Sequence, residues 1–232
     1  LAVGDLNADG KTDLAVGAYG NASSAGRTYI FYSDGSYPGA AASAEVSITG
    51  DLGASFTSEA LVTGDFNADG KTDIAIGGNL YSSTTGRVFI VYNDGTYPSS
   101  TASADVTISG EAGSSFGQSL AAGDFNADGE VDLAVGANTY NSAYGRVYIF
   151  YNDGSYASAA GSADVLIDGS FAATQFGSNL GSGDLNADGK IDLIGQASGA
   201  GGNGHGQIYL FYNDGSIPTT SGTADVTITG ES

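Results

Sequence analysis

Residues 123–136 read GDFNADGEVDLAVG, and nearly the same text occurs three more times in the chain. The other copies are GDLNADGKTDLAVG at 4–17, GDFNADGKTDIAIG at 64–77 and GDLNADGKIDLIGQ at 183–196. The first aspartates of the four copies, Asp5, Asp65, Asp124 and Asp184, are spaced 60, 59 and 60 residues apart. A fixed period of this length is typical of repeat architectures, so we expect four copies of one structural unit.

Each unit contains four short segments rich in β-branched and aromatic residues, separated by Gly, Asn, Asp and Ser. Examples are LAAGDF at 120–125, DLAVGA at 132–137, RVYIFY at 146–151 and, from the preceding unit, DVTIS at 105–109. This composition predicts β-strands, and no window shows a helical period of useful length. The Asp-Gly pair in YNDGSY, directly after the third segment, is a hairpin signal.

Four strands per unit at a constant period predict an all-β fold, a β-propeller built of four-stranded antiparallel blades. We expect one repeat domain over residues 1–232, with blades at approximately 1–50, 51–110, 111–169 and 170–232. No segment is left over for a closing strand exchanged between the termini. The four blades could close a ring alone, form part or half of a ring of seven or eight blades, or pair with a second copy.

The chain has 26 acidic and 6 basic residues and a formal net charge of −20. Such a surface excludes nucleic acid and anionic membranes as partners, and no apolar run is long enough to insert in a membrane. Cys and Met are absent and His occurs once. With no thiol chemistry and no Ser/His/Asp set, the chain is not expected to be an enzyme.

The acidic loop follows the pattern D-x-N-x-D-G-x-x-D. Positions 1, 3, 5 and 9 supply side-chain oxygens, position 7 can supply its backbone carbonyl, and the glycine at position 6 allows a sharp reversal. Hard oxygen donors at odd spacing are typical of Ca²⁺ loops, whereas Mg²⁺ prefers few protein ligands and several waters. The predicted ligands are Asp5, Asn7, Asp9, Lys11, Asp13, Asp65, Asn67, Asp69, Lys71, Asp73, Asp124, Asn126, Asp128, Glu130, Asp132, Asp184, Asn186, Asp188, Lys190 and Asp192.

Asp, Asn and Gly also form turns that hold no metal. However, three uncompensated carboxylates within ~5 Å repel one another by kilocalories at the dielectric of a protein surface, and a plain turn has no reason to repeat them four times. The loop differs from an EF-hand because position 12 is Val16, Ile76, Val135 or Gly195 rather than Glu. The aspartates at position 9 must therefore close the site.

The stretch SSFGQSLAAGDFNADGEVDLAVGA at 114–137 resembles the FG-GAP repeat of integrin α-subunit propellers and their bacterial relatives. Phe116-Gly117 provides the "FG" and Val135-Gly136-Ala137 the "GA", and the same order of elements covers essentially the whole chain. The resemblance implies a β-propeller with up to four Ca²⁺ in the loops between strands 1 and 2, and extracellular adhesion or ligand binding rather than catalysis. Phe56-Thr57 and Gln196 depart from the motif, and four intact acidic loops favour a bacterial or archaeal surface protein over an integrin-like receptor.

In an up-and-down blade, the loops between strands 2 and 3 lie at the end opposite the acidic loops. They carry the least repetitive text, at 18–26, 78–86, 137–145 and 197–206. Variable loops on a rigid scaffold are natural binding sites, although they are equally consistent with unconstrained surface loops. The tyrosines able to stack on a sugar or anchor a peptide are Tyr19, Tyr81, Tyr140 and Tyr144.

The leading hypothesis is a calcium-stabilised, extracellular or cell-surface adhesion module that binds a protein or carbohydrate ligand. One alternative is a structural subunit of a surface layer or extracellular fibre, in which copies of the chain contact one another. The other is a non-catalytic propeller segment of a larger secreted protein.

Overall fold

A computed structural model describes residues 1–20, 25–51, 60–199 and 205–231, and these form four sheets of four antiparallel strands, each in chain order. The expected all-β architecture of propeller blades is confirmed. Blade 1 contains β1 (Ala2–Gly4), β2 (Asp13–Ala18), β3 (Arg27–Phe31) and β4 (Val46–Thr49); blade 2 contains β5 (Leu61–Gly64), β6 (Asp73–Gly78), β7 (Arg87–Val91) and β8 (Val106–Ser109). Blade 3 contains β9 (Ser119–Gly123), β10 (Asp132–Ala137), β11 (Arg146–Phe150) and β12 (Val165–Asp168); blade 4 contains β13 (Phe176–Gly183), β14 (Asp192–Ala197), β15 (Gln207–Phe211) and β16 (Val226–Thr229).

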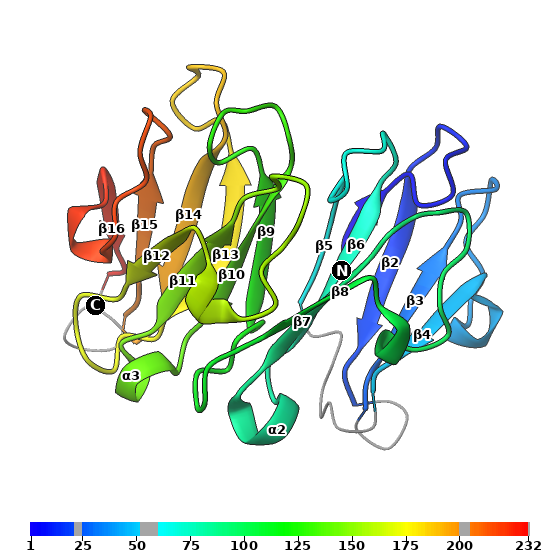
Figure 1. Ribbon diagram of the computed structural model, residues 1–232, viewed down its shortest axis with the longest axis horizontal. Helices are drawn as coiled ribbons and strands as arrows, with labels where there is room; N and C mark the ends of the chain where they lie inside the picture. The colour runs from blue at the N-terminus through cyan, green and yellow to red at the C-terminus, as the bar shows by residue number, and fades with distance from the viewer. Residues whose placement is uncertain (21–24, 52–59, 200–204, 232) are drawn as a thin grey trace.

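The blades are arranged in an arc around their first strands. Along the arc, β1 packs on β5, β5 on β9, and β9 on β13. The later strands of each blade run outward from this centre, with those of blade 1 and blade 4 extending in opposite directions (Figure 1). Blades 1 and 4 are therefore the two ends of the arc.

The apolar core lies between consecutive blades, not within a single sheet. Ile48 and Phe89 share the cluster between blades 1 and 2, whereas Ile108 and Tyr148 share the one between blades 2 and 3. Between blades 3 and 4, Ile167 packs with Phe211. Successive side chains of a strand point to opposite faces. The third strands of blades 2 and 3 begin with an arginine and are apolar and buried at the next four positions, so they are covered on both sides as the sequence predicts.

The Phe-Gly pairs of the linkers fill the wedge between blades. Phe116 is fully buried, and its ring centroid lies 5.2 Å from that of Tyr148 and 6.2 Å from that of Phe150. Phe176 repeats this arrangement between blades 3 and 4. The glycine that follows each Phe turns the chain in the left-handed region, at φ 86° for Gly117. The variant pair Phe56-Thr57 lies outside the described residues.

Gly136 on β10 is where the next linker approaches the sheet most closely. A Cβ at this position would overlap the carbonyl oxygen of Gly177 and the hydroxyl of Ser119. We expect Gly136→Ala to destabilise the chain by about 1–3 kcal/mol, since overpacking forces the backbone to shift. Gly20 has free space around its Cα, so Gly20→Ala is the matched control and should change stability by less than about 0.5 kcal/mol. Equal urea midpoints for the two variants would contradict this packing.

The connection from the third to the fourth strand differs from the hairpin that YNDGSY indicated. The Gly of each Asp-Gly pair does adopt positive φ, 97° at Gly95, but the strands are joined by residues 92–105, not by a tight turn. Each connection also contains one 3-10 turn, at η1 (Ala41–Ser43), η2 (Thr101–Ser103), η3 (Ala160–Ser162) or η4 (Ser221–Thr223). The hairpin signal therefore located a turn but gave the wrong length for the connection.

These long connections reach back to the preceding blade. The amide of Thr49, on the outer strand of blade 1, donates to the carbonyl of Ser99 in blade 2 at 2.9 Å. The amides of Ser109 and Asp168 make the same bond to the blades that follow them. The outer edges of blades 1, 2 and 3 are thereby covered by the next blade, which protects an otherwise exposed strand edge.

Candidate functional site

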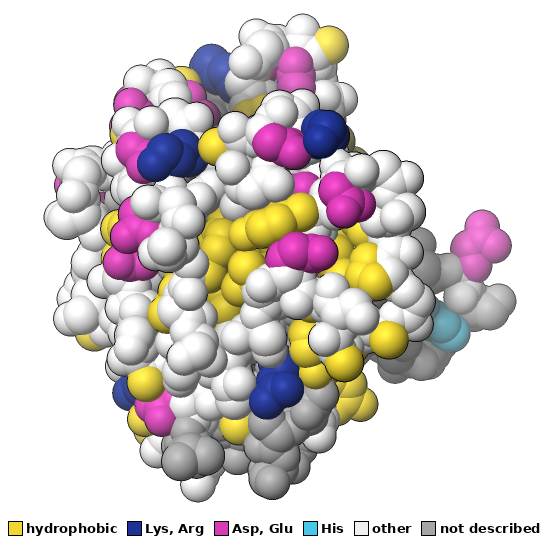
Figure 2. Space-filling view, turned by 90° about the vertical axis from the view of Figure 1, so that its right-hand side faces the viewer, with side chains coloured by type: hydrophobic (Ala, Val, Ile, Leu, Met, Phe, Trp, Pro, Cys, Tyr) yellow, Lys and Arg dark blue, Asp and Glu magenta, His cyan; other side chains and the backbone are white. Residues whose placement is uncertain are grey.

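The four acidic loops, one from each blade, lie together along one side of the molecule, the upper side in Figure 1, which we call the acidic end. Figure 2 shows acidic side chains gathered over the upper half of the surface, with basic side chains beside them. Each loop turns through two left-handed residues, at φ 57° for Ala68 and 84° for Gly70 in blade 2. The glycine meets this requirement without strain, as the sequence predicts.

Inside each loop, the polar side chains hold the backbone. In blade 1, Asp5 accepts hydrogen bonds from the amides of Asp9 and Gly10 at 3.0 and 2.8 Å. Asn7 accepts from the amide of Asp9 at 3.0 Å, and Asp9 accepts from the amide of Lys11 at 2.9 Å. The other three loops repeat these four bonds. The side chains at positions 1, 3 and 5 therefore order the loop before any ion is considered.

The aspartate at position 9 is fully buried and joins two parts of the blade. The carboxylate of Asp73 accepts from the amide of Phe66 at 2.9 Å and from the amide of Asn93 at 2.7 Å. Asp13, Asp132 and Asp192 repeat both bonds. The position-9 aspartate therefore links the acidic loop to the segment that follows the third strand. Sequence reasoning missed this role, because the donor lies about 20 residues away and no local pattern marks it.

The carboxylates differ in how their charge is compensated. Burial raises the pKa of Asp73 from 3.8 to about 6, and the negative charges of Asp69 and Asp65 raise it further. Burial raises the pKa of Asp132 to about 6 in the same way. In blades 1 and 2 the lysine at position 7 offsets part of the charge, with Lys11 Nζ 3.0 Å from Asp9 and Lys71 Nζ 3.6 Å from Asp69.

A metal-free chain is expected to be more stable at pH 5 than at pH 7.5. Because Asp73 and Asp132 have a higher pKa in the folded chain than in the unfolded one, the folded state holds their protons more tightly. Their contribution to stability is full below about pH 4 and is lost as the pH rises through 6. Melting curves in chelator at both pH values test this, and Asp73→Asn should flatten the difference. A higher melting temperature at pH 7.5 would contradict it.

The donor chemistry of the loops fits Ca²⁺, although no converged cluster is seen. Among the described residues, no group of three or more His, Cys, Asp or Glu side chains lies close enough together to hold a metal ion. Yet each loop offers three carboxylates and one amide oxygen, and each carboxylate oxygen keeps lone pairs beyond its amide bonds. Asp73 is also buried beside two other acids, and keeping its carboxylate charged there costs electrostatic free energy. A bound cation would offset that cost.

Two of the predicted tyrosines stack on an arginine of their own blade. The ring of Tyr81 lies 3.7 Å from the guanidinium of Arg87, and Tyr140 lies 3.9 Å from that of Arg146. Both tyrosines begin short turns, α2 (Tyr81–Thr84) and α3 (Tyr140–Ala143), whose inner residues adopt left-handed φ/ψ values that the sequence did not signal. One ring face of each tyrosine is therefore used within the blade, by a cation–π contact.

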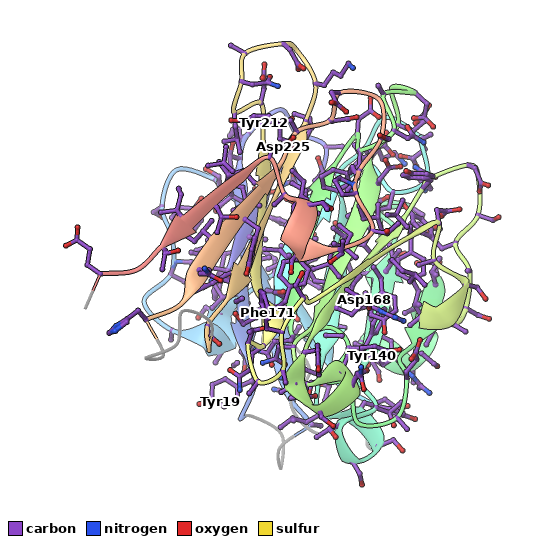
Figure 3. The ribbon with its side chains drawn as sticks, turned by 90° about the vertical axis from the view of Figure 1, so that its left-hand side faces the viewer. Tyr19, Tyr140, Asp168, Phe171, Tyr212 and Asp225 are labelled. Atoms are coloured by element: carbon purple, nitrogen blue, oxygen red, sulfur yellow. The ribbon has the colours of Figure 1, made fainter. Side chains whose placement is uncertain are left out.

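Tyr19 is 56% exposed, while Tyr144 is partly buried beside the linker that leads to blade 4. Figure 3 shows Tyr19 and Tyr140 at the lower end of the molecule, away from the acidic end. The structure thus places the four tyrosines at the opposite end from the acidic loops, on three different blades. Residues 21–24 and 200–204 of the variable loops lie outside the described residues.

Comparisons with known proteins agree with the repeat pattern. The FG-GAP repeat family matches residues 1–31, 58–91 and 116–150. Human integrin alpha-IIb is 37% identical over 106 residues, which cover 41% of this chain and 10% of the integrin. Rat phosphatidylinositol-glycan-specific phospholipase D is 32% identical over 161 residues, 62% of this chain and 19% of the phospholipase.

The crystal structure of the V. cholerae biofilm matrix protein Bap1 aligns with a TM-score of 0.34 and 16% identity, over 92% of this chain and 37% of that one. The chain spans about a tenth of the length of the integrin α-subunits that it matches. No helix within the described ranges is both long and apolar enough to cross a membrane.

Proposed function

We propose that this chain, an FG-GAP repeat protein with an integrin-like propeller, is a calcium-stabilised, extracellular ligand-binding or adhesion module. The observation that carries the proposal is the fourfold repetition of one loop geometry, with a buried aspartate and three further oxygen-bearing side chains in every copy. The relatives that match are integrin α-subunits and a phospholipase D, and this chain covers a minor part of each. We therefore assign it binding and no catalytic step.

In this proposal each Ca²⁺ is held by the side chains at positions 1, 3, 5 and 9 and by the backbone carbonyl at position 7. When bound, the ion supplies positive charge that offsets the buried carboxylate. The side chains of the loop hold its backbone in place through the amide hydrogen bonds described above. Asp73 and its equivalents attach the loop to the segment that follows the third strand. The metal loops hold the scaffold, and recognition is assigned to the opposite end.

The loop of blade 3 is expected to bind Ca²⁺ most tightly. Glu130 stands where the other loops have a lysine, so this loop has one more negative charge and no amine competing for its carboxylates. Affinity in calcium loops rises with the charge of the ligands. Glu130→Lys should weaken one site, and Lys71→Glu should strengthen one, each by roughly tenfold if the change is worth about 1.4 kcal/mol. If Glu130→Lys strengthened Ca²⁺ binding or Lys71→Glu weakened it, the charge at position 7 would not act on the ion as proposed.

Ligand binding is tested with the immobilised chain on arrays of carbohydrates and extracellular matrix proteins, in Ca²⁺ and in chelator. We expect binding in Ca²⁺ that is reduced by Tyr19→Ala. Tyr37 is 51% exposed and donates to the carbonyl of Thr12 in the acidic loop, so Tyr37→Ala is the control for an exposed tyrosine elsewhere. Loss of binding with Tyr37→Ala alone would move recognition to the acidic end, and the absence of any ligand in Ca²⁺ would contradict the proposal.

A further inference from the structure

The arginines that begin the third strands are not all neutralised by acids. In blade 3, Arg146 donates from Nε and Nη2 to the carboxylate of Asp168 at 2.5 and 3.0 Å, and its Nη1 lies 3.7 Å from the carboxylate of Glu111. Figure 3 shows Asp168 near Tyr140, whose ring stacks on the same guanidinium. A bidentate arginine–carboxylate pair is a strong contact, so the charge of Arg146 is matched within the chain.

Arg87, the equivalent arginine of blade 2, lacks both of these acids. Ser109 stands opposite Arg87 on β8, where blade 3 has Asp168. Asp51 takes the place of Glu111 but its side chain is one methylene shorter. Within the described chain, Arg87 forms no ion pair and its side chain donates no hydrogen bond. One of only 6 basic residues is thus left unpaired in a chain with 26 acidic residues.

An aromatic ring holds the guanidinium of Arg87 in position. The guanidinium lies 3.7 Å from the ring centroid of Tyr81, the first residue of α2. The next three residues, 82–84, adopt left-handed φ values of 47°, 57° and 70°. Residues other than glycine rarely adopt this conformation, and such strain gathers at binding sites. The strained turn therefore fixes an unpaired cation at the lower end of the molecule in Figure 1, away from the acidic loops.

The outer edge of this guanidinium is open to solvent. Of the three nitrogens of Arg87, only Nε is enclosed by protein without a hydrogen bond. The two Nη atoms also have no partner within the described residues, but they are not enclosed, so they face solvent. In blade 3, the Asp168 side chain that pairs with the equivalent arginine is itself 52% exposed. A carboxylate arriving from solution can therefore reach the Nη atoms of Arg87.

Blades 1 and 4 do not repeat this arrangement. Arg27 of blade 1 lies 5.9 Å from the ring of Tyr29, and no tyrosine stacks on it more closely within the described residues. In blade 4 the position is Gln207, which carries no charge and donates to the hydroxyl of Thr229. Among the described residues, blade 2 alone combines an unpaired arginine with a closely stacked tyrosine.

The surroundings of Arg87 match the chemistry of a sugar. Ser82 and Ser83 are exposed in the same turn as Tyr81. Their hydroxyls can both donate and accept hydrogen bonds, as the hydroxyls of a sugar also do. The ring of Tyr81 is partly exposed, and only one of its faces is used by Arg87. An unpaired cation, two hydroxyls and an aromatic ring thus lie within one short segment of the chain.

Two features disfavour an extended peptide or a polyanion at this place. A peptide that adds as a strand needs a free sheet edge, but the amide of Ser109 on β8 already donates to the carbonyl of Ser158 in blade 3 at 2.9 Å. The formal charge of −20 repels a polyanion. A single acidic group is affected less, because salt screens charges more than about 8 Å apart at physiological ionic strength. The observations therefore favour a sugar that carries one acidic group.

We propose that Arg87 and the turn α2 form a binding site for an acidic saccharide. The carboxylate of the sugar pairs with the Nη atoms of Arg87, and its ring packs beside Tyr81. The ligand thereby supplies the negative charge that Asp168 supplies to the equivalent arginine of blade 3. This inference rests on the proposed ligand-binding role, which it narrows to one chemical class and one blade, and it does not depend on the calcium loops.

The test is an NMR titration of the 232-residue chain in Ca²⁺ with methyl glucuronoside and with methyl glucoside, which has the same ring but no carboxylate. We expect the glucuronoside to bind at least tenfold more tightly and to shift the amide signals of residues 81–87. Equal binding of the two sugars, or no binding of the glucuronoside, would overturn the proposal. Acetate tests the carboxylate alone, and an affinity equal to that of the glucuronoside would overturn the assignment to a sugar.

Two variants test the role of Arg87. Arg87→Gln removes the cation, and Ser109→Asp supplies the carboxylate that blade 3 has at this position. Each should weaken glucuronoside binding at least tenfold. Ser109→Asp recreates an ion pair that the fold already contains, so its melting temperature should not fall. Ser155→Asp adds the same charge to an exposed site at the acidic end and should bind as the wild type does. Unchanged affinity in both test variants would overturn the proposal.

Blade 3 offers the converse test. A variant with Asp168→Ser and Glu111→Gln removes both acids from Arg146, which already stacks on Tyr140. This variant should bind two molecules of the glucuronoside per chain where the wild type binds one. A single site in the variant would contradict the claim that an unpaired, stacked arginine is what binds the sugar.

Repeating the titration in chelator separates this site from the calcium loops. At a temperature at which the calcium-free chain is folded, the glucuronoside should bind as it does in Ca²⁺. Binding that is lost in chelator and unchanged by Arg87→Gln would mean that a calcium ion holds the carboxylate, which would overturn this inference and leave the metal proposal intact. A chain that binds other ligands on the arrays but not the glucuronoside would likewise overturn this inference alone.

Discussion

Transfer of the chain from about 10 mM Ca²⁺ into chelator is expected to lower its melting temperature by more than about 10 °C. For the affinities typical of extracellular calcium modules, on the order of 10⁻⁴–10⁻³ M, that concentration stabilises a folded chain by about 1.4–2.7 kcal/mol per site. Four equal sites would contribute roughly 6–11 kcal/mol, and about 1 kcal/mol moves the melting temperature of a chain of this size by roughly 2–4 °C. The physical cause is removal of the charge that offsets Asp73 and its buried equivalents.

The control separates a bound ion from simple screening. Sodium chloride at the same ionic strength relieves repulsion among the 26 acidic side chains but does not bind the loops. Mg²⁺ at the same concentration tests the preference for a cation that accepts many protein oxygens. If sodium chloride restored the melting temperature as fully as Ca²⁺, the stabilisation would be general screening, and the metal proposal would fail.

Phe116→Ala is expected to cost about 3–5 kcal/mol of stability, since truncation of a fully buried Phe removes transfer energy and leaves a cavity. The effect should be large because this ring contacts Tyr148 and Phe150 and seals the wedge between blades 2 and 3. Two edge-to-face aromatic contacts are lost as well, each worth about 0.5–1.5 kcal/mol beyond buried area. Urea unfolding followed by circular dichroism measures the change.

Phe171→Ala provides the matched control for this substitution. Phe171 lies in the linker between blades 3 and 4, as Phe116 lies in the linker between blades 2 and 3, but it is 65% exposed. Its truncation should change stability by less than about 0.5 kcal/mol. Similar losses for the two variants would mean that the Phe of the Phe-Gly pair is not a core residue, contrary to the packing described above.

The architecture could be predicted from the sequence because its signals are local and repeated. RVYIFY at 146–151 is apolar at successive positions, which indicates a strand covered on both faces, and β11 is buried from Val147 to Phe150. The acidic loops could be predicted in the same way, because the pattern Asp-x-Asn-x-Asp-Gly specifies both the turn and the oxygen donors. Four nearly identical copies made each of these inferences stronger than one copy would allow.

The features that could not be predicted depend on contacts between residues of different segments. The two amide bonds to Asp73 join residues 7 and 20 positions away, and the stacking of Tyr81 on Arg87 requires a left-handed turn at Ser82 and Ser83. Asp-Gly in YNDGSY marked a turn, but the connection then runs back to the preceding blade, which only the neighbouring sheet can show.

The central claim is that each acidic loop binds one Ca²⁺, and calorimetric titration of the chelator-treated chain tests it most directly. We expect four Ca²⁺ per chain for the wild type and three for a variant with Asp124→Ala and Asp128→Ala, which removes the donors of one loop. The melting temperature of the variant in Ca²⁺ should fall between those of the calcium-bound and calcium-free wild type. No heat of binding, or the same stoichiometry in the variant and the wild type, would contradict the account.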